Sequence, residues 1–72
     1  MSEFIENLEE LLEKTQGSLQ STTLLSEITS WDSMAAVGFL ALADAKYGIA
    51  VSPGALQKCK TIGDLAALVG QA

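Results

Sequence analysis

Ser33 is the residue of this chain whose surroundings best suit it for chemistry. It follows Asp32 at the predicted start of a helix, where free N–H groups and the positive end of the helix dipole favour an anion. The chain has no histidine, so neither Ser-His nor Cys-His catalysis can activate its hydroxyl. Helix starts are also rich in serines with a purely structural role. If Ser33 is modified, another enzyme must activate it.

Cys59 is the only cysteine. A lone cysteine excludes an internal disulfide, and without histidine we expect no metal site. We interpret Cys59 as a small buried hydrophobic residue rather than as a reactive thiol. The chain also lacks catalytic groups and the size for a large pocket, so an enzyme is the least favoured class.

The acidic balance of the chain restricts its partners. Nine acidic and four basic residues give a net charge of −5, which repels nucleic acid phosphates and anionic lipids. We therefore expect no nucleic acid and no membrane partner. The 72 residues suit one domain, and 49% hydrophobic residues argue against disorder. With no secretory signal and no apolar stretch long enough to cross a bilayer, we expect a cytoplasmic protein.

Three main helices and one short helix are predicted to position Ser33. The first has an apolar face with helical spacing, and Gly17 is expected to end it in the left-handed conformation. Its glutamates are interpreted as a solvated face, with docking as the alternative. That apolar face consists of Phe4, Ile5, Leu8, Leu11 and Leu12.

A long Ser/Thr-rich connection, residues 17–30, precedes the second helix, and we expect it to be an ordered loop with room for a turn of helix. Four apolar residues should hold it to the core. They are Leu19, Leu24, Leu25 and Ile28.

The second helix is predicted over residues 32–47. Asp32 is expected to cap it by accepting from the N–H of Ala35, and Ser30 is the competing cap. A short helix opens at Pro53, and the last one opens at Thr61, whose spacing from Asp64 is that of a capping box. No segment is a convincing strand.

The second helix has two apolar faces. One carries large side chains and should face the core: Ala36, Phe39, Leu40, Ala43 and Tyr47. The opposite stripe is also uncharged: Met34, Gly38, Ala41 and Ala45. This stripe is either a wet surface of small residues or a docking surface. Because position 38 should face solvent, Gly38→Glu is expected to leave folding intact.

The residues around Ser33 resemble a known family. Asp32, Ser33 and Met34 resemble the Asp-Ser-Leu attachment motif of acyl carrier proteins, in its Asp-Ser-Met variant. The segment 24–28 before Trp31 is similar to the loop that precedes this motif. Residues 47–49 (Tyr-Gly-Ile) and 61–65 (Thr-Ile-Gly-Asp-Leu) resemble the end of its second helix and the start of its last. The ordered set covers essentially the whole chain.

The resemblance implies an all-α, acyl-carrier-like four-helix bundle with a long first loop, a single carrier domain over residues 1–72. It implies that a phosphopantetheinyl transferase moves 4′-phosphopantetheine from coenzyme A onto Ser33. The arm's thiol then carries an acyl, polyketide or aminoacyl group as a thioester. An acyl- or aminoacyl-loading ligase and a downstream synthase or transferase are the implied further partners of a monomeric carrier that does no chemistry itself.

The resemblance also implies a cargo pocket between the second, third and fourth helices. Its walls would be Phe39, Ala43, Val51, Leu56, Cys59, Ile62 and Leu65, which are equally suited to be plain core. Partner docking would involve Met34, Ala35, Gly38, Ala41, Asp44 and Ala45.

The chain departs from the family pattern on the exposed side of the second helix. Fatty-acid carriers typically have carboxylates there, and only Asp44 keeps a charge at the matching positions. This favours a specialised carrier, and Trp31 is expected to pack the loop. The alternative function is a helical interaction module without a prosthetic group.

Overall fold

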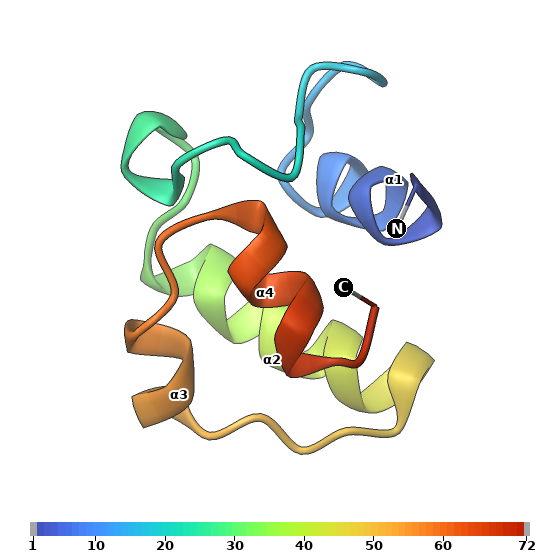
Figure 1. The fold of residues 1–72 in the computed structure, drawn as a ribbon, viewed down its shortest axis with the longest axis vertical. Coiled ribbons are helices and arrows are strands. Elements are labelled where there is room, and N and C mark those ends of the chain that lie inside the picture. Colours follow the sequence, from blue (N-terminus) through green and yellow to red (C-terminus); the bar gives the residue numbers. More distant parts are fainter. Residues whose placement is uncertain (1, 72) are drawn as a thin grey trace.

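Helices account for the regular structure of this chain (Figure 1). The computed structural model describes residues 2–71. Over this range there is no strand, only an isolated bridge between Leu24 and Thr61. The all-α architecture of three main helices, one short helix and a long first loop is therefore confirmed. The elements are α1 (Ser2–Leu11), the 3₁₀ turn η1 (Leu25–Glu27), α2 (Ser33–Tyr47), α3 (Pro53–Gln57) and α4 (Ile62–Leu68).

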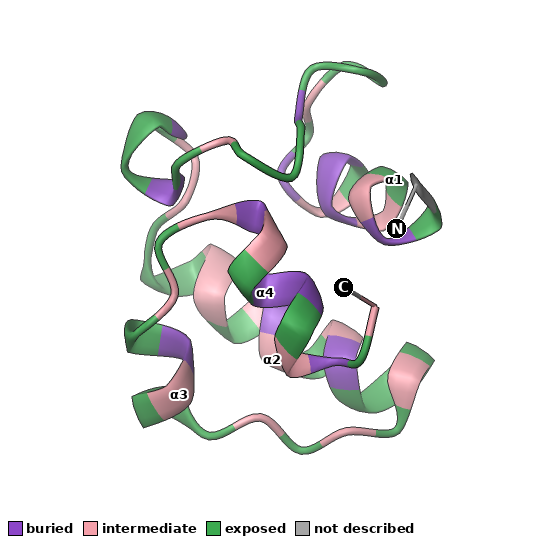
Figure 2. Cartoon of the chain, in the orientation of Figure 1, coloured by how far each residue is buried: buried purple, intermediate pink, exposed green. Residues whose placement is uncertain are grey.

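The core lies where α1, α2 and α4 turn their apolar faces toward one another, as the buried purple segments of Figure 2 show. The Phe4 ring of α1 stands edge-on to Phe39 of α2, with centroids 6.1 Å apart, and lies 6.0 Å from the Tyr47 ring. Each such aromatic pair contributes about 1 kcal/mol beyond its buried area. The largest fully buried side chains are Phe4, Phe39, Leu8, Ile62 and Leu65.

The long loop between α1 and α2 is held by both side chains and backbone. Leu19, Leu25 and Ile28 are buried as predicted, whereas Leu24 is 42% exposed. The backbone of this loop pairs with the start of α4, since the N–H of Leu25 donates to Lys60 O at 2.8 Å. The loop is therefore an ordered part of the bundle, including the predicted helical turn.

Gly63 lets the loop backbone pass close to α4. Its N–H donates to Ser21 O at 2.8 Å, and a Cβ built on it would lie 3.1 Å from that same oxygen. A side chain at position 63 would therefore push the loop away.

The end of α1 differs from the prediction that Gly17 caps it. The left-handed residue is Glu13, with φ of 57°, and the N–H of Lys14 donates to Glu9 O at 2.7 Å in a Schellman arrangement. After Leu12 the next apolar residue is Leu19, so further helical turns would bury nothing. Gly17 is left-handed as well, but it lies in the loop.

Glu9 is not part of the solvated acidic face. It is only 3% exposed, and its Oε2 accepts from the N–H groups of Gly17 at 2.8 Å and Leu19 at 3.1 Å. Burial of a carboxylate is costly unless hydrogen bonds satisfy it. Glu9 therefore ties the long loop to α1.

Candidate functional site

Ser33 is the first residue of α2, and it is exposed. The preceding Asp32 has extended backbone, and its Oδ1 accepts from the N–H of Ala35 at 2.9 Å. Its carbonyl accepts from the N–H of Ala36, also at 2.9 Å. Asp32 is therefore the N-cap that presents Ser33, and Ser30 does not take that role.

The start of α2 has room for an anion beside the Ser33 hydroxyl. The first four N–H groups at a helix start lack partners within the helix, and the Asp32 side chain accepts from one of them, that of Ala35. The N–H groups of Ser33 and Met34 remain to meet water or an anion at the positive end of the dipole. No acidic residue lies in the first turn itself. A phosphodiester on the Ser33 oxygen therefore fits this position.

Trp31, just before α2, packs against the core and so fixes how the loop enters the helix. The Trp31 ring stands edge-on to Phe39, with centroids 6.3 Å apart, and is half-buried against the core. Trp31 therefore packs the loop, as predicted. Ser30 Oγ is buried beside it with no hydrogen-bond partner among the described residues.

The outer face of α2 is apolar and exposed. Met34 is 82% exposed and Val37 is 66% exposed, while Ala41, Asp44 and Ala45 are exposed as well. The sequence reading of this stripe missed Val37. Its position three residues after Met34 and four before Ala41 could have placed it there.

Gly38 is partly covered by α1, so the expectation that this position faces solvent freely is wrong. A Cβ built at position 38 would lie 2.8 Å from Leu11 Cδ1 of α1. A glycine here lets α1 and α2 approach closely. The two residues in contact, Leu11 and Gly38, are 27 positions apart in the sequence. Ala35, another proposed docking residue, is also partly buried and packs against the core.

The seven proposed cargo-pocket residues form core in this structure. Five are buried in the central cluster: Phe39, Ala43, Leu56, Ile62 and Leu65. Val51 and Cys59 are partly buried against it. Core and pocket can share residues, so cargo binding here stays a prediction.

Cys59 lines a surface groove between α3 and α4. Its Sγ lies 3.7 Å from Ala55 O, and burial together with the nearby Asp64 carboxylate raises the pKa of the thiol. The thiol therefore stays protonated at neutral pH, which agrees with its interpretation as an unreactive residue.

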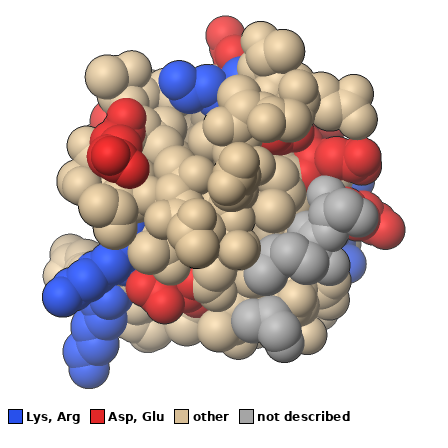
Figure 3. All heavy atoms as spheres, turned by 45° about the horizontal axis from the view of Figure 1, so that its top comes forward, with Lys and Arg blue, Asp and Glu red and all other residues tan. Residues whose placement is uncertain are grey.

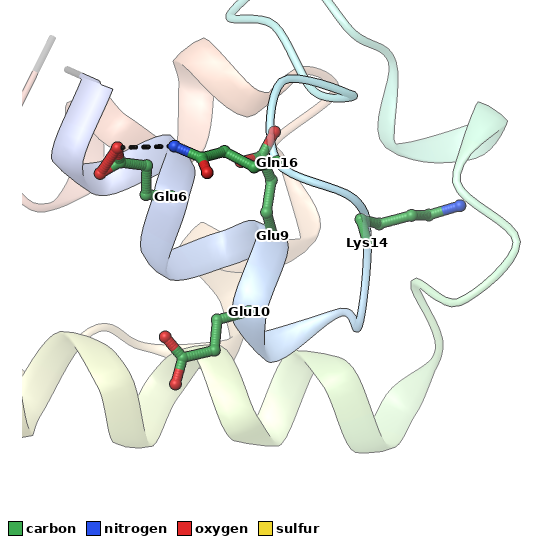
Figure 4. Close-up of a pocket in the computed structure, with 5 residues that line it drawn as sticks. All are labelled: Glu6, Glu9, Glu10, Lys14 and Gln16. Carbon is green, nitrogen blue, oxygen red and sulfur yellow. Dashed lines mark hydrogen bonds between the residues drawn. The ribbon is translucent and has the colours of Figure 1, made fainter.

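A second surface cavity lies along α1 (Figure 4), lined by Glu6, Glu9, Glu10, Lys14 and Gln16. Gln16 Nε2 donates to Glu6 Oε1 at 3.5 Å, and Glu9 is engaged with the loop as described. Figure 4 shows the Lys14 side chain directed away from these acids. Residues 2–71 contain no group of three His, Cys, Asp or Glu side chains placed to hold a metal ion.

Charged side chains lie toward the edges of the face in Figure 3, and its middle is uncharged. Within the described range, no helix has the length and apolar character needed to cross a membrane.

Comparison with protein families finds one match that covers nearly the whole chain. The family model described as "phosphopantetheine attachment site" matches residues 3–69. No curated protein and no solved structure matches the chain. In the matched family, 4′-phosphopantetheine is attached covalently to this domain. The match covers nearly the whole sequence, so the chain belongs to the phosphopantetheine attachment family and is a phosphopantetheine-bearing carrier protein.

Proposed function

We propose that Ser33 is the residue that receives the arm. The supporting observation is its exposed position as the first residue of α2, directly after the Asp32 cap. The two neighbouring N–H groups and the helix dipole favour the phosphodiester that would result.

The modification is a group transfer that the chain does not catalyse. The Ser33 oxygen forms a new bond to phosphorus, its proton passes to a base of the transferase, and the nucleotide part of coenzyme A leaves. The chain has no histidine to serve as that base. When bound, the arm supplies a terminal thiol that holds cargo as a thioester.

The proposed role is that of one carrier domain, without enzymatic activity, in the cytoplasm. Its cargo is an acyl, polyketide or aminoacyl group, loaded by a ligase and used by a synthase or transferase. The nearly uncharged outer side of α2 supports a specialised carrier rather than one for housekeeping fatty acid synthesis. For partner docking, the exposed residues Met34, Ala41, Asp44 and Ala45 remain the proposed contacts, with Val37 added to them.

A loading assay tests this proposal. The pure apo protein is incubated with coenzyme A and a broad-range phosphopantetheinyl transferase, and its intact mass is measured. We expect one arm on the wild type and none on Ser33→Ala. A wild type that stays unmodified, while a control carrier is fully modified, would falsify the assignment. An arm on the Ser33→Ala variant would place the attachment at another residue.

A further inference from the structure

We propose that the groove between the end of α1 and the start of α2 is a resting site for the arm carried on Ser33, with Ser30 as its hydrogen-bonding residue. This groove shares no residue with the predicted cargo pocket between α2, α3 and α4. The inference rests on the proposed function of Ser33. It adds the residues of this chain that receive the neutral part of the arm.

The groove lies next to the proposed attachment residue. It is lined by residues 11–13 at the end of α1, by Ser30, and by residues 32, 34 and 35 around the start of α2. Ser33 itself does not line it, so a group on the Ser33 oxygen would enter by bending around the helix start. The volume of the groove is about 340 Å³, within the range of about 300 to 1,000 Å³ that small-molecule sites span. The groove therefore has room for part of the arm.

Ser30 gives the groove a polar group that lacks a partner. Its Oγ is buried and has no hydrogen-bond partner among the described residues. Buried polar groups are nearly always paired, so an unpaired one calls for an explanation. Because Ser30 lines the groove, rotation about its χ1 angle can turn the hydroxyl toward a bound group. An amide or hydroxyl of the arm would supply the missing partner.

The remaining lining combines apolar and polar groups, which matches the neutral part of the arm. Beyond its phosphate, the arm has a carbon with paired methyl groups, a hydroxyl, amides and a terminal thiol. Leu11, Leu12 and Met34 supply apolar wall for the methyl groups. Asp32 uses Oδ1 for the helix cap and Glu13 is exposed, so carboxylate oxygens remain to accept from amide N–H groups.

Covalent attachment makes even a weak site effective. A short flexible link gives the attached group an effective concentration of about 1 mM. A groove with a dissociation constant of about 1 mM for the free arm would therefore be about half occupied by the attached one. Such a site can hold the arm between visits to partner enzymes and still release it to them.

Nuclear Overhauser contacts test the location of the arm. Isotope-labelled apo protein is loaded from unlabelled coenzyme A, and intact mass confirms that one arm is attached. We expect contacts between the methyl protons of the arm and the methyl groups of Leu11 and Leu12. Both leucines are distant from Ser33 in the sequence, so attachment alone cannot produce these contacts. The absence of contacts to both leucines, or contacts to Val51 and Leu56 in their place, would overturn the proposal.

Thermal melts of the apo and loaded forms test the role of Ser30. Ser30→Ala removes the unpaired hydroxyl, and the matched control Thr29→Ala removes a hydroxyl from the exposed neighbour outside the groove. We expect the arm to raise the melting temperature of the wild type and of Thr29→Ala by about 3 °C or more, and that of Ser30→Ala by clearly less. Apo Ser30→Ala should be no less stable than the apo wild type, because its hydroxyl has no partner there.

The outcomes separate this inference from the proposed function. Equal gains in all three proteins, or an apo Ser30→Ala that is less stable than the apo wild type, would contradict the role of Ser30. If Ser30→Ala does not fold, the leucine contacts in the wild type still decide the proposal. A wild type that accepts no arm refutes the proposed function itself, and intact mass shows this before either measurement.

Discussion

Asp32 and Ser33 show how two adjacent residues divide the roles at a helix start. Asp32 satisfies the backbone N–H of Ala35, and this leaves Ser33 as an exposed first residue with no capping role of its own. The hydroxyl is therefore presented outward, where an external enzyme can reach it. This geometry is local, spanning the four residues from Asp32 to Ala35, and for that reason the sequence could predict it.

Glu9 links α1 to the loop through bonds to residues eight and ten positions further along the chain. Substituting Glu9 should show how much this link contributes to stability. In Glu9→Ala the buried N–H of Leu19 and the N–H of Gly17 lose their acceptor, so we expect a loss of about 2 to 4 kcal/mol in unfolding free energy. Glu9→Gln keeps one acceptor oxygen and should lose less. Urea denaturation measures both variants, and an equal loss in the two would contradict the role of that oxygen.

Gly38 gives a second test at the residue scale. Gly38→Glu must displace the end of the flexible Leu11 side chain, since even a Cβ would lie 2.8 Å from its Cδ1. Losing a glycine also favours the helix, so we expect a net loss of about 1 kcal/mol. Ala41→Glu on the exposed side of the same helix is the control and should change stability by less than about 0.5 kcal/mol. Thermal melts of the two variants that coincide would show that α1 does not cover position 38.

Neither the burial of Glu9 nor the contact of Gly38 with α1 could be predicted from the sequence. By helical periodicity Glu9 lies at the edge of the apolar face, between Ile5 and Leu12, but its charge favours exposure, and the loop that buries it has no regular pattern. Gly38 falls on an uncharged stripe, and only the position of α1 makes part of that stripe interior. The exposed position of Ser33 and its Asp32 cap were predictable because they depend on local motifs. Helix faces that depend on packing between distant segments were not.

At the scale of elements, the end of α1 stores a small strain. Glu13 adopts the left-handed conformation without being glycine, which costs about 1 kcal/mol. Glu13→Gly should remove this strain and raise stability by up to about 1 kcal/mol, although the unfolded chain gains freedom. Chemical denaturation checks the sign. A clear loss of stability would indicate that the Glu13 side chain makes a contact that outweighs the strain.

The capping box of α4 gives a pH dependence. Backbone N–H groups of Lys60 and Thr61 donate to the Asp64 carboxylate and lower its pKa. A lowered folded-state pKa means that the stabilisation is complete above the ordinary aspartate pKa and is lost as pH falls through the lowered value. Below about pH 4, stability should therefore fall more steeply in the wild type than in Asp64→Asn. Parallel stability curves for the two proteins would argue against this assignment.

At the scale of the whole molecule, one helix serves both the core and the surface. The inner side of α2 supplies Phe39 and Ala43 to the core, and its outer side exposes Met34 and Val37 beside the proposed attachment residue. A helix that is apolar all round is normally buried. Here the far part of the exposed side carries only Ala41, Asp44 and Ala45, and its two large apolar side chains lie near Ser33. The most exposed apolar side chains of α2 therefore lie next to the proposed attachment residue.

The attachment at Ser33 can be tested most directly by tandem mass spectrometry of the protein purified from the cell that makes it. Trypsin cleavage after Lys14 and Lys46 gives a peptide with Ser33 and four other serines. Fragmentation of this peptide assigns the arm and its cargo to one residue. We predict 4′-phosphopantetheine on Ser33 alone. A Ser33 that is unmodified in every preparation, or an arm on another serine, would contradict the account.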